Sequence, residues 1–307
     1  MFRYLLCLFL ICVTASAIAA ETVATRVADG VYAFIGERGD IAPDNRGRIG
    51  NGGFIVGDDG IVVIDTGVSD REGRARLAAI RAVSARPIVL VVVTHAVQEF
   101  LFGNTAFVEA GAELLCHAKS AELMRARCEH CLENLRLILG EDEMAGTRLI
   151  IPTRVVDGDT DLVVGGRRIA LLHPGWASTP GDLLVLDRAT GVLFTGGLVV
   201  NGRIPELRDG RFDDWVAAID RLAKIPATML VPGYGPPMLP ADAVRTRDYL
   251  LALDGRVRGL YESNRSLMET IEQATLPQFA TWSGYETVHR KNTLGRYLEL
   301  ELQELGK

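Results

Sequence analysis

The chain has 307 residues, of which 48% are hydrophobic and 23% are charged, which is the balance of an ordinary globular protein rather than of a disordered or fibrous one. Its formal net charge of −6, with no cluster of basic residues, argues against a nucleic-acid partner. This length suffices for one large domain or two small ones.

The first twenty residues, MFRYLLCLFLICVTASAIAA, predict a cleaved secretory signal peptide at 1–20. Arg3 supplies the positive start, Tyr4 to Val13 form an apolar stretch, and the alanines that follow suit a signal peptidase. The apolar stretch is too short for a permanent bilayer anchor, and no other long apolar span follows. We therefore expect a periplasmic or secreted protein with no membrane anchor after cleavage.

Strands and helices alternate in the first half of the chain. Apolar, β-branched runs predict strands at 31–36, 52–57, 61–67 and 87–95 and at the stretch ELLC. Helical periodicity predicts helices at 71–83, with Asp70 as the N-cap, near 102–110, and at 119–139.

The second half begins with two predicted hairpins and ends in helices. The hairpins span 161–173, turning at Gly165-Gly166, and 182–197, turning at Ala189-Thr190-Gly191. An amphipathic helix at 211–225 and a strand at 228–235 follow, and the sequence is helical from about 240 onward. Strands that arrive in two blocks among helices predict an α/β fold with two sheets packed face to face and helices outside.

Five short motifs, taken in chain order, resemble those of the metallo-β-lactamase superfamily between about 28 and 236. The stretch IVVIDTG, with Asp65 and Gly67, stands where the family has an Asp-containing strand end. The stretch VVVTHAVQEFLFGN stands where it has His-x-His-x-Asp-His followed by Gly-Asn. The stretches GWASTPGDLLVL, LFTGG and LVPGYG stand where it has a His before Thr-Pro-Gly-Asp, Phe-Thr-Gly-Asp and Val-Pro-Gly-His-Gly.

The resemblance implies an αββα metallo-β-lactamase-like sandwich at 21–239, with the site at its loop edge, and a helical C-terminal extension at 240–307. Two further stretches, ARCEHCLENLRLILG and HRKNTLGRYLELE, resemble exported members of the superfamily that are associated with quinoprotein and sulfur-oxidation systems. They suggest a biological setting rather than a reaction.

This chain departs from the family at its metal-ligand positions. The first His is present as His95, and the family's Asp is replaced by the longer Glu99. The other positions hold Val97, Phe100, Ser178, Gly197 and Tyr234. A catalytic zinc needs about three protein ligands and an open position. We therefore expect that the dinuclear zinc site is lost, that the chain has no zinc-hydrolase activity and that it needs no cofactor.

The residues around the changed ligands are kept, namely Asp65, Thr179, Gly181, Asp182, Gly196 and Gly233. A kept framework with changed ligands predicts a stable, metal-free scaffold without assigned catalytic residues. Its former active-site pocket should bring together Asp65, His95, Glu99, Ser178 and Tyr234. Three states of this pocket stay open: a hydrogen-bonded network, one hard metal ion held by His95, Glu99 and Tyr234, or packing alone.

A second group of soft ligands lies in one short segment: Cys116, His117, Cys128, His130 and Cys131. A zinc site is one interpretation. Helical spacing instead places the last two cysteines on an apolar face, with Cα atoms about 5 Å apart. We predict a local Cys128–Cys131 disulfide, which would add little stability because its loop is tiny. Buried thiols, or work with a metal or in redox chemistry, are the alternatives.

Four other side chains are candidates for site residues. His173 is interpreted as a strand-end residue near the site edge and His289 as a surface residue in a charged segment. Trp176 forms either a wall of the pocket or ordinary packing. Ser178 has no base-and-orienter pair in the sequence, which disfavours a serine nucleophile.

The sequence is compatible with three functions. The first is a non-hydrolytic exported pseudoenzyme that binds a small molecule or a periplasmic protein partner in the former active cleft. The second is an enzyme, either a hydrolase with a rebuilt metal site or one that uses metal-free acid-base chemistry. The third is a structural or chaperone-like partner of an exported redox enzyme. Because function depends on the site and not on the fold, the ligand count favours the first and third.

Overall fold

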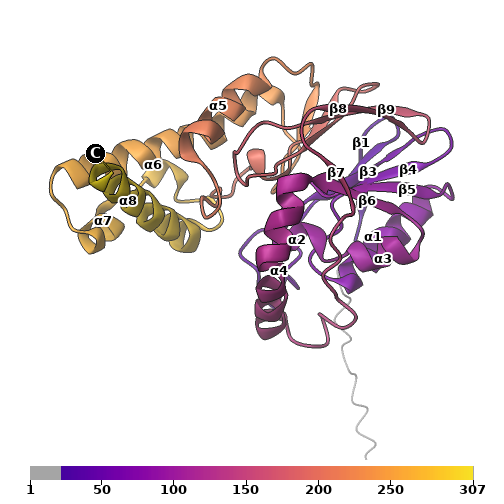
Figure 1. Cartoon of the computed structure of the whole chain (residues 1–307), viewed down its shortest axis with the longest axis horizontal. Coiled ribbons are helices and arrows are strands. Elements are labelled where there is room, and N and C mark those ends of the chain that lie inside the picture. The colour runs from indigo at the N-terminus through magenta and orange to yellow at the C-terminus, as the bar shows by residue number, and fades with distance from the viewer. Residues whose placement is uncertain (1–21, 307) are drawn as a thin grey trace, which may run out of the picture.

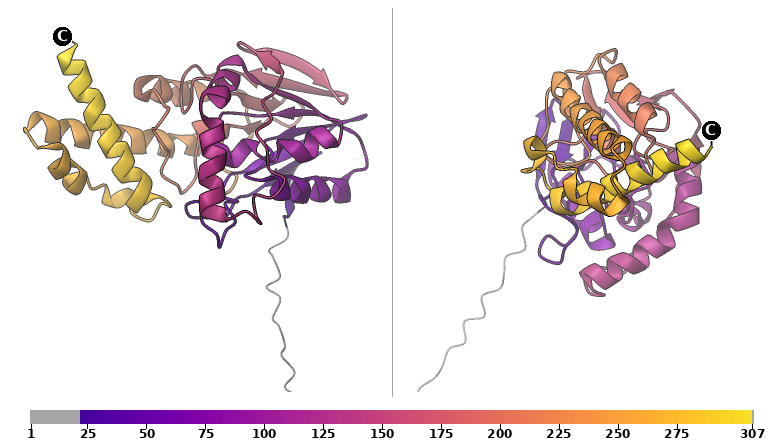
Figure 2. Two further views of the ribbon diagram at one scale, coloured as in Figure 1. Left: turned by 60° about the horizontal axis from the view of Figure 1, so that its bottom comes forward. Right: turned by 90° about the vertical axis from the view of Figure 1, so that its left-hand side faces the viewer.

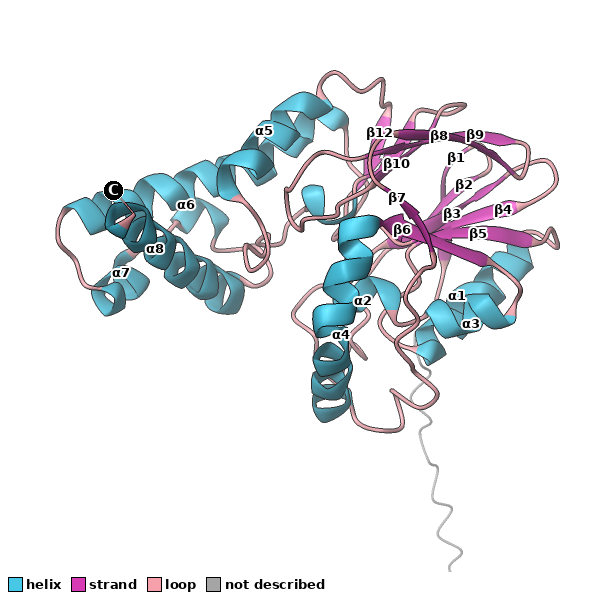
Figure 3. Ribbon diagram, in the orientation of Figure 1, coloured by secondary structure: helices cyan, strands magenta, loops and turns pink. Residues whose placement is uncertain are grey.

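Two β-sheets pack face to face and helices cover their outer faces, which gives four layers (Figure 1). The computed structural model describes residues 22–306, so the signal peptide predicted at 1–20 lies outside the described residues. The predicted α/β class, an αββα sandwich with C-terminal helices, is confirmed. Figure 3 shows the strands gathered at the centre of the sandwich and the helices around them.

The first sheet, sheet A, has seven strands in chain order. Strands β1 to β4 are antiparallel and strands β4 to β7 are parallel. The predictions missed the two edge strands, β1 and β7, because both are short and only partly buried and so lack a long apolar run. The strands are β1 (Ala24–Ala28), β2 (Val31–Phe34), β3 (Gly52–Val56), β4 (Ile61–Ile64), β5 (Ile88–Val92), β6 (Glu113–His117) and β7 (Arg154–Val156).

The second sheet, sheet B, has five strands in the order β12-β11-β10-β9-β8. Both predicted hairpins are present, and the first turns at Gly165 and Gly166, which have φ values of 58° and 75° that favour glycine. Strands β11 and β12 are parallel because a helix connects them. The strands are β8 (Thr160–Val164), β9 (Arg167–Leu172), β10 (Leu184–Asp187), β11 (Val192–Phe194) and β12 (Met229–Val231).

An apolar layer fills the space between the two sheets. Sheet A contributes alternate side chains such as Val62, Ile64 and Val92, and sheet B contributes Val185 and Phe194, all at most 2% exposed. Strands β4, β5 and β10 are buried on both faces, because helices or the other sheet cover each side. This packing fixes the ends of the strands, where the site lies.

Helices α1 (Asp70–Val83), α2 (Gln98–Leu101), α3 (Asn104–Glu109) and α4 (Ala118–Leu139) belong to the half of the chain that forms sheet A. Two predictions about them need correction. The N-cap of α1 is Ser69 and not Asp70, because the Ser69 hydroxyl accepts from the Glu72 amide. The helix predicted near 102–110 is α3, which begins only at Asn104, and the short helix α2 that precedes it was not predicted. Gly103 separates the two helices, and a Cβ there would lie 2.1 Å from the Thr66 carbonyl oxygen.

The remaining helices cover sheet B and continue beyond it as the C-terminal extension, which projects from one side of the sandwich (Figure 2). The 3-10 turn η1 (Gly196–Leu198) and helix α5 (Phe212–Leu222) lie nearest to sheet B. The extension contains η2 (Pro240–Ala243), α6 (Val244–Glu262), α7 (Leu267–Gln273), η3 (Pro277–Phe279), the π-helical turn η4 (Tyr285–His289) and α8 (Arg290–Leu305).

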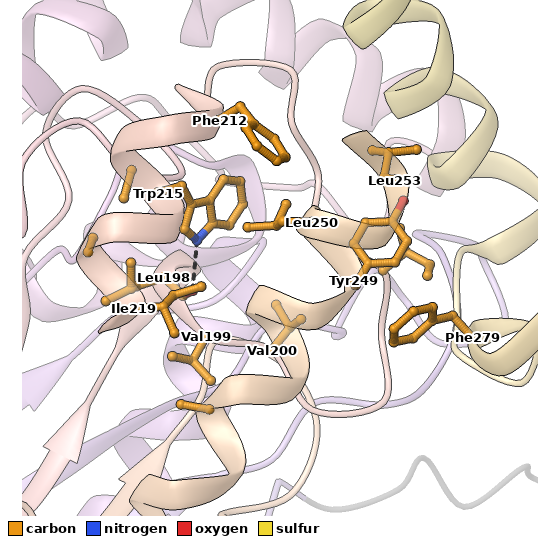
Figure 4. Close-up of a cluster of buried hydrophobic side chains, with 14 of the residues drawn as sticks. Leu198, Val199, Val200, Phe212, Trp215, Ile219, Tyr249, Leu250, Leu253 and Phe279 are labelled. Carbon is orange, nitrogen blue, oxygen red and sulfur yellow. Dashed lines mark hydrogen bonds between the residues drawn. The ribbon is translucent and has the colours of Figure 1, made fainter. Parts of the chain in front are cut away.

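One apolar cluster joins the extension to the sandwich (Figure 4). Trp215 of α5 is 1% exposed, and its indole N–H donates to the Leu198 carbonyl at 2.9 Å. Leu250 of α6 belongs to the same cluster, which continues to Tyr249 and Phe279. The extension therefore packs on α5 and sheet B through a continuous core.

His289, interpreted from the sequence as a surface residue, is buried at 5% exposure. Its Nε2–H donates to the Ala274 carbonyl at 2.6 Å, so Nδ1 is left to accept from the Tyr249 hydroxyl at 3.0 Å. The Asn292 amide donates to that hydroxyl at 3.0 Å. The surface prediction was wrong because packing on α6, which the local charge pattern does not show, encloses the ring.

Within residues 22–306, no helix combines the length and the apolar character that a crossing of a bilayer requires.

Candidate functional site

The predicted site residues gather where several strands end at one edge of the sandwich. Asp65 follows β4 and His95 lies just after β5. Ser178 precedes β10, and Tyr234 follows β12. Because these strands lie side by side within two packed sheets, residues distant in sequence meet at this edge.

Asp65, Thr94 and His95 form a buried hydrogen-bonded chain. Asp65 accepts from the Thr94 amide at 2.8 Å and from its hydroxyl at 2.7 Å. The Thr94 oxygen lies 2.7 Å from His95 Nδ1, so with Asp65 ionised the imidazole donates through Nδ1. Burial raises the pKa of Asp65 to about 7 and lowers the pKa of His95 to about 3. His95 is therefore neutral, and Nε2 is its free acceptor.

Asp182 holds the loop that carries Ser178. Its carboxylate accepts from the Ser178 amide at 2.7 Å and from the Ser178 hydroxyl at 2.9 Å. The Thr179 hydroxyl donates at 2.6 Å and the Thr179 amide at 3.1 Å. Burial raises the pKa of Asp182 to about 6, although these donors oppose the shift. The Asp182 carboxylate thus accepts from four donors, two of Ser178 and two of Thr179, and the Ser178 hydroxyl is fixed as one of them.

Glu99 and Tyr234 form a separate pair. The Tyr234 hydroxyl donates to a Glu99 carboxylate oxygen at 2.6 Å. Burial raises the pKa of Glu99 and raises that of Tyr234 well above 10, so the phenol keeps its proton. The Phe100 ring lies between this pair and His95, with ring centroids 4.3 Å from His95 and 5.3 Å from Tyr234. The imidazole therefore does not join the carboxylate and the phenol in one network: Glu99 and Tyr234 form one hydrogen-bonded pair, and His95 belongs to the chain of Asp65 and Thr94.

A small cavity, here called the chamber, lies where the family resemblance places metals. Its volume is about 30 Å³, which is room for one or two water molecules. A Cβ on Gly197 would lie 2.3 Å from the Ser178 hydroxyl and 3.1 Å from His95 Nε2, so these groups surround the glycine closely. The chamber is lined by His95, Val97, Ser178, Gly197, Val200, Arg203, Pro205, Glu206, Arg208, Asp209, Trp215 and Tyr234.

The donor set of the chamber does not fit zinc. Val97, Phe100 and Gly197 offer no side-chain lone pair, and the Tyr234 hydroxyl is used by Glu99. Within residues 22–306, no group of three or more His, Cys, Asp or Glu side chains is arranged to hold a metal ion. Ser178 donates to Asp182, and the Glu206 and Asp209 carboxylates contact Arg208. His95 is the donor left at the family's ligand positions, which is fewer than the three protein ligands that a catalytic zinc requires.

A larger cavity, here called the groove, adjoins the chamber. Its volume is about 600 Å³, and it shares Glu206 and Arg208 with the chamber. It lies between the loop that precedes α5 and the first turns of α8. The groove is lined by Glu206, Leu207, Arg208, Gly210, Phe212, Lys291, Asn292, Leu294, Gly295, Arg296, Leu298 and Glu299.

The sequence reasoning missed the charged residues that close the chamber and open the groove. They come from one loop, RIPELRDGR, which contributes Arg203, Glu206, Arg208 and Asp209. Arg203 stacks on the Tyr234 ring, with its guanidinium carbon 4.8 Å from the ring centroid. A signal was available, because this loop is rich in charge and begins shortly after the LFTGG motif.

The cysteine-histidine segment does not assemble into a metal site. His130 is exposed and lies 3.2 Å from Glu133, and His117 stacks on His173 with ring centroids 4.1 Å apart. Cys128 and Cys131 are free thiols in the structure, in place of the predicted disulfide. Cys128 lies in the core and Cys131 at its margin, and no bond joins them. Their oxidation to a disulfide stays a prediction.

Trp176 and His173 lie near the site edge. The Trp176 indole N–H donates to the Asp209 carbonyl at 2.6 Å, and the Arg211 guanidinium lies over its ring at 3.9 Å. Trp176 therefore supports a loop that lines the chamber without lining the chamber itself. His173 Nδ1 donates to the Asp182 carbonyl at 2.8 Å, which agrees with a strand-end role.

A family model described as the metallo-beta-lactamase superfamily matches residues 45–234, which is more than half of the chain. The chain belongs to the metallo-β-lactamase superfamily. A linear primary-alkylsulfatase from Pseudomonas sp. (strain ATCC 19151) is 25% identical over 265 residues, covering 73% of this chain and 49% of that protein. The chain thus spans about half the length of this curated relative.

Solved structures show the same fold. A metallo-β-lactamase from Pontibacter korlensis is 22% identical, with a TM-score of 0.60 over 74% of this chain and 98% of that one. One from Hirschia baltica is 19% identical, with a TM-score of 0.59 over 74% and 96%. A double mutant of the sec-alkyl sulfatase PisA1 is 19% identical, with a TM-score of 0.67 over 91% of this chain and 50% of that one.

Proposed function

We propose that this protein is a non-hydrolytic member of its superfamily that binds an anionic amphiphile, of the alkyl sulfate kind, in the groove. The observation that carries the proposal is the contrast in size between the two adjoining cavities, about 30 Å³ for the chamber and about 600 Å³ for the groove. A reacting ester and its attacking water do not fit in the chamber, whereas an alkyl chain with a small anionic head fits in the groove.

The groove has an apolar wall that suits an alkyl chain. Leu294 and Leu298, one helical turn apart on α8, are 37% and 41% exposed. Leu207 and Phe212 face them from the opposite loop. Gly295 lies between the two leucines and has no atom within 4 Å of an added Cβ, which leaves the centre of the wall open. Covering this wall with an alkyl chain would remove apolar surface from water.

The groove also has cations to which an anionic head could bind. Arg208 contacts Asp209 at 3.2 Å and Glu206 at 3.8 Å, but its side chain is still 46% exposed. Among the residues that the structure describes, Lys291 has no carboxylate within salt-bridge distance. Arg296, in contrast, is neutralised by Asp254 at 2.7 Å. Lys291, with Arg208, is therefore the natural partner for a sulfate or carboxylate.

The relative supports this ligand class, because a linear primary-alkylsulfatase acts, by its name, on linear alkyl sulfates. A hydrolase with metal-free acid-base chemistry is less well supported, since Ser178 is held as a donor to Asp182 and the chamber is nearly full. The proposed setting is periplasmic, as an accessory protein of a quinoprotein or sulfur-oxidation system, either with the bound anion or with a protein partner.

Calorimetric titration of the mature protein with decyl sulfate, below its critical micelle concentration, tests the proposal. We expect saturable binding of one anion per chain and no release of inorganic sulfate above the buffer blank. Decyltrimethylammonium, which has the same chain and the opposite charge, should bind more weakly.

Variants locate the binding site. Lys291→Gln should weaken binding about threefold to fivefold, as loss of one partly exposed ion pair implies. Leu294→Asp should weaken it at least about tenfold, because it places a carboxylate on the apolar wall. Lys224→Gln, at an exposed position outside the groove, is the matched control. Equal affinity of both lysine variants, or sulfate release by the wild type, would contradict the proposal.

A further inference from the structure

The sequence Cys128-Glu129-His130-Cys131 is a Cys-x-x-Cys motif that the proposed function does not use. Both cysteines lie on α4, one helical turn apart. Cys128 is 0% exposed within the apolar core beneath sheet A, whereas Cys131 is half-buried at the margin of that core. A buried thiol therefore stands directly behind an accessible one.

Charged groups surround the accessible thiol. Arg127 binds both carboxylate oxygens of Asp209, and Arg208 contacts the same carboxylate at 3.2 Å. The neighbouring Cys128 thiol and the positive charges of Arg127 and Arg208 lower the pKa of Cys131 to about 6, although burial and the Asp209 carboxylate oppose the shift. The third cysteine differs, because burial raises the pKa of Cys116 to about 12.

We propose that Cys131 and Cys128 form a thiol–disulfide exchange site, with Cys131 as the attacking sulfur, Cys128 as the resolving sulfur, and an anionic low-molecular-weight disulfide as the co-substrate. Half-burial of Cys131 favours a small disulfide over a protein one. Arg127 and Arg208 both contact the Asp209 carboxylate, and their combined effect on the pKa of Cys131 exceeds that of Asp209. The positive charge that they retain favours a disulfide that carries carboxylates, such as oxidised glutathione.

The exchange balances in two steps. The Cys131 thiolate attacks one sulfur of the small disulfide, which forms a mixed disulfide and releases one thiolate. Cys128 then loses its proton to that released thiolate and attacks the Cys131 sulfur. The second small thiolate leaves and takes up the proton that Cys131 had lost to solvent. Two protein thiols are oxidised to one disulfide, and one small disulfide is reduced to two thiols.

The product disulfide should be easy to reduce. It closes a loop of only a few residues within one helix, so it removes little entropy from the unfolded chain. Both cysteines lie within α4, which is already formed in the reduced state, so the disulfide is not needed to hold the helix together. Disulfides that add little stability and lie near the surface are the reducible ones, which suits reversible exchange rather than a structural bond.

The test equilibrates the mature protein in buffers of varied oxidised-to-reduced glutathione ratio, followed by acid quenching, denaturation and maleimide labelling. We expect two of the three mature-chain thiols to disappear together at one midpoint and to return on addition of reduced glutathione. Cys116→Ser should leave that midpoint unchanged and lower the count of labelled thiols by one throughout.

Single-cysteine variants assign the roles. Cys128→Ser should trap a mixed disulfide with one glutathione on Cys131, visible by intact mass. Cys131→Ser should react with oxidised glutathione at least about tenfold more slowly, because Cys128 is enclosed. Cys128→Ala provides the same assay if the serine is not tolerated in the core. Arg127→Gln should slow trapping on Cys131, and Arg127→Lys should restore it in part.

Three results would overturn the proposal. One is persistence of all three labelled thiols in the most oxidising buffer. Another is independent oxidation of the two thiols, each ending as a stable mixed disulfide. The last is a disulfide that the reduced glutathione buffer does not reopen, which would make the bond structural.

Discussion

Two buried chains of side-chain hydrogen bonds, one in the C-terminal extension and one at the loop edge, end in different ways. In the extension, Asn292 donates to Tyr249, Tyr249 to His289, and His289 to the Ala274 carbonyl, so the chain starts and ends on protein groups. At the loop edge, the chain of Asp65, Thr94 and His95 ends at Nε2, which faces the chamber. Every polar atom that ends the first chain of hydrogen bonds has a protein partner, whereas the second chain ends at an imidazole nitrogen that faces the chamber.

This difference distinguishes the residues that hold the loops in place from the residues that face the chamber. Asp65 and Asp182 keep the loops of the edge in place with buried hydrogen bonds that need no metal. The family's ligand positions hold other side chains here, and Glu99, Phe100 and Tyr234 contact one another at this edge. The edge therefore keeps the family's framework residues, while most of its ligand positions hold side chains of another kind.

The largest effect should come from breaking the framework at the edge. Asp182→Ala removes the acceptor of two amides and two hydroxyls, all buried, and should lower the free energy of unfolding by about 3 kcal/mol or more. Asp161→Ala, at an exposed ion pair with Arg188, is the control and should change it by less than about 1 kcal/mol. Urea unfolding measures both. A loss as small as that of the control would mean that the framework does not stabilise the edge.

A smaller effect is expected from the filling of the chamber. Tyr234→Phe and Glu99→Gln should each lower the free energy of unfolding by about 1 kcal/mol, because each disrupts the buried 2.6 Å hydrogen bond. The double variant should lose less than the sum of the two, since both remove the same contact. Denaturant unfolding of the two single variants and the double variant gives the coupling. Additive losses within error would show that these side chains only pack.

The smallest effect concerns the complete chain of the extension and depends on pH. Burial lowers the pKa of His289, so the imidazole stays neutral in the folded state. In the unfolded chain the same imidazole takes up a proton as the pH falls through about 6.5. The stabilising contribution is full above that pH and is lost as the pH falls below it. The loss of stability from pH 7.5 to 5 should therefore be smaller in His289→Gln than in the wild type.

The matched control for this pH dependence is His130→Gln, because His130 is exposed at 85% of its side chain. It should reproduce the wild-type pH dependence. Parallel curves for the His289 variant and the wild type would show that the buried imidazole does not titrate as described.

The sequence predicted the fold well where a residue's role is local. The five motifs lie at strand ends. The turn glycines and the Asp182 carboxylate could be predicted there, because positive φ and contacts to Ser178 and Thr179 involve only neighbouring residues. Strands β1 and β7 escaped prediction because pairing at the edges of a sheet needs no long apolar run. Helix α3 begins later than predicted, after Gly103, which lies close to Thr66, a residue distant in sequence.

The site was predicted only in part for the same reason. The sequence placed His95, Ser178 and Tyr234 at one edge, and the structure brings them to the chamber. The groove could not be predicted, because it forms between a loop before α5 and a helix some eighty residues later. The burial of His289 likewise depends on Tyr249 of another helix. Contacts between distant elements decide both features, and local periodicity does not record them.

The zinc content of the purified mature protein tests the central claim most directly. The claim is that the edge retains the framework of a metal site without its donors, since Val97, Phe100 and Gly197 offer none. Elemental analysis after brief exposure to excess zinc and desalting should find well under one zinc per chain. Two zinc ions per chain would contradict the account.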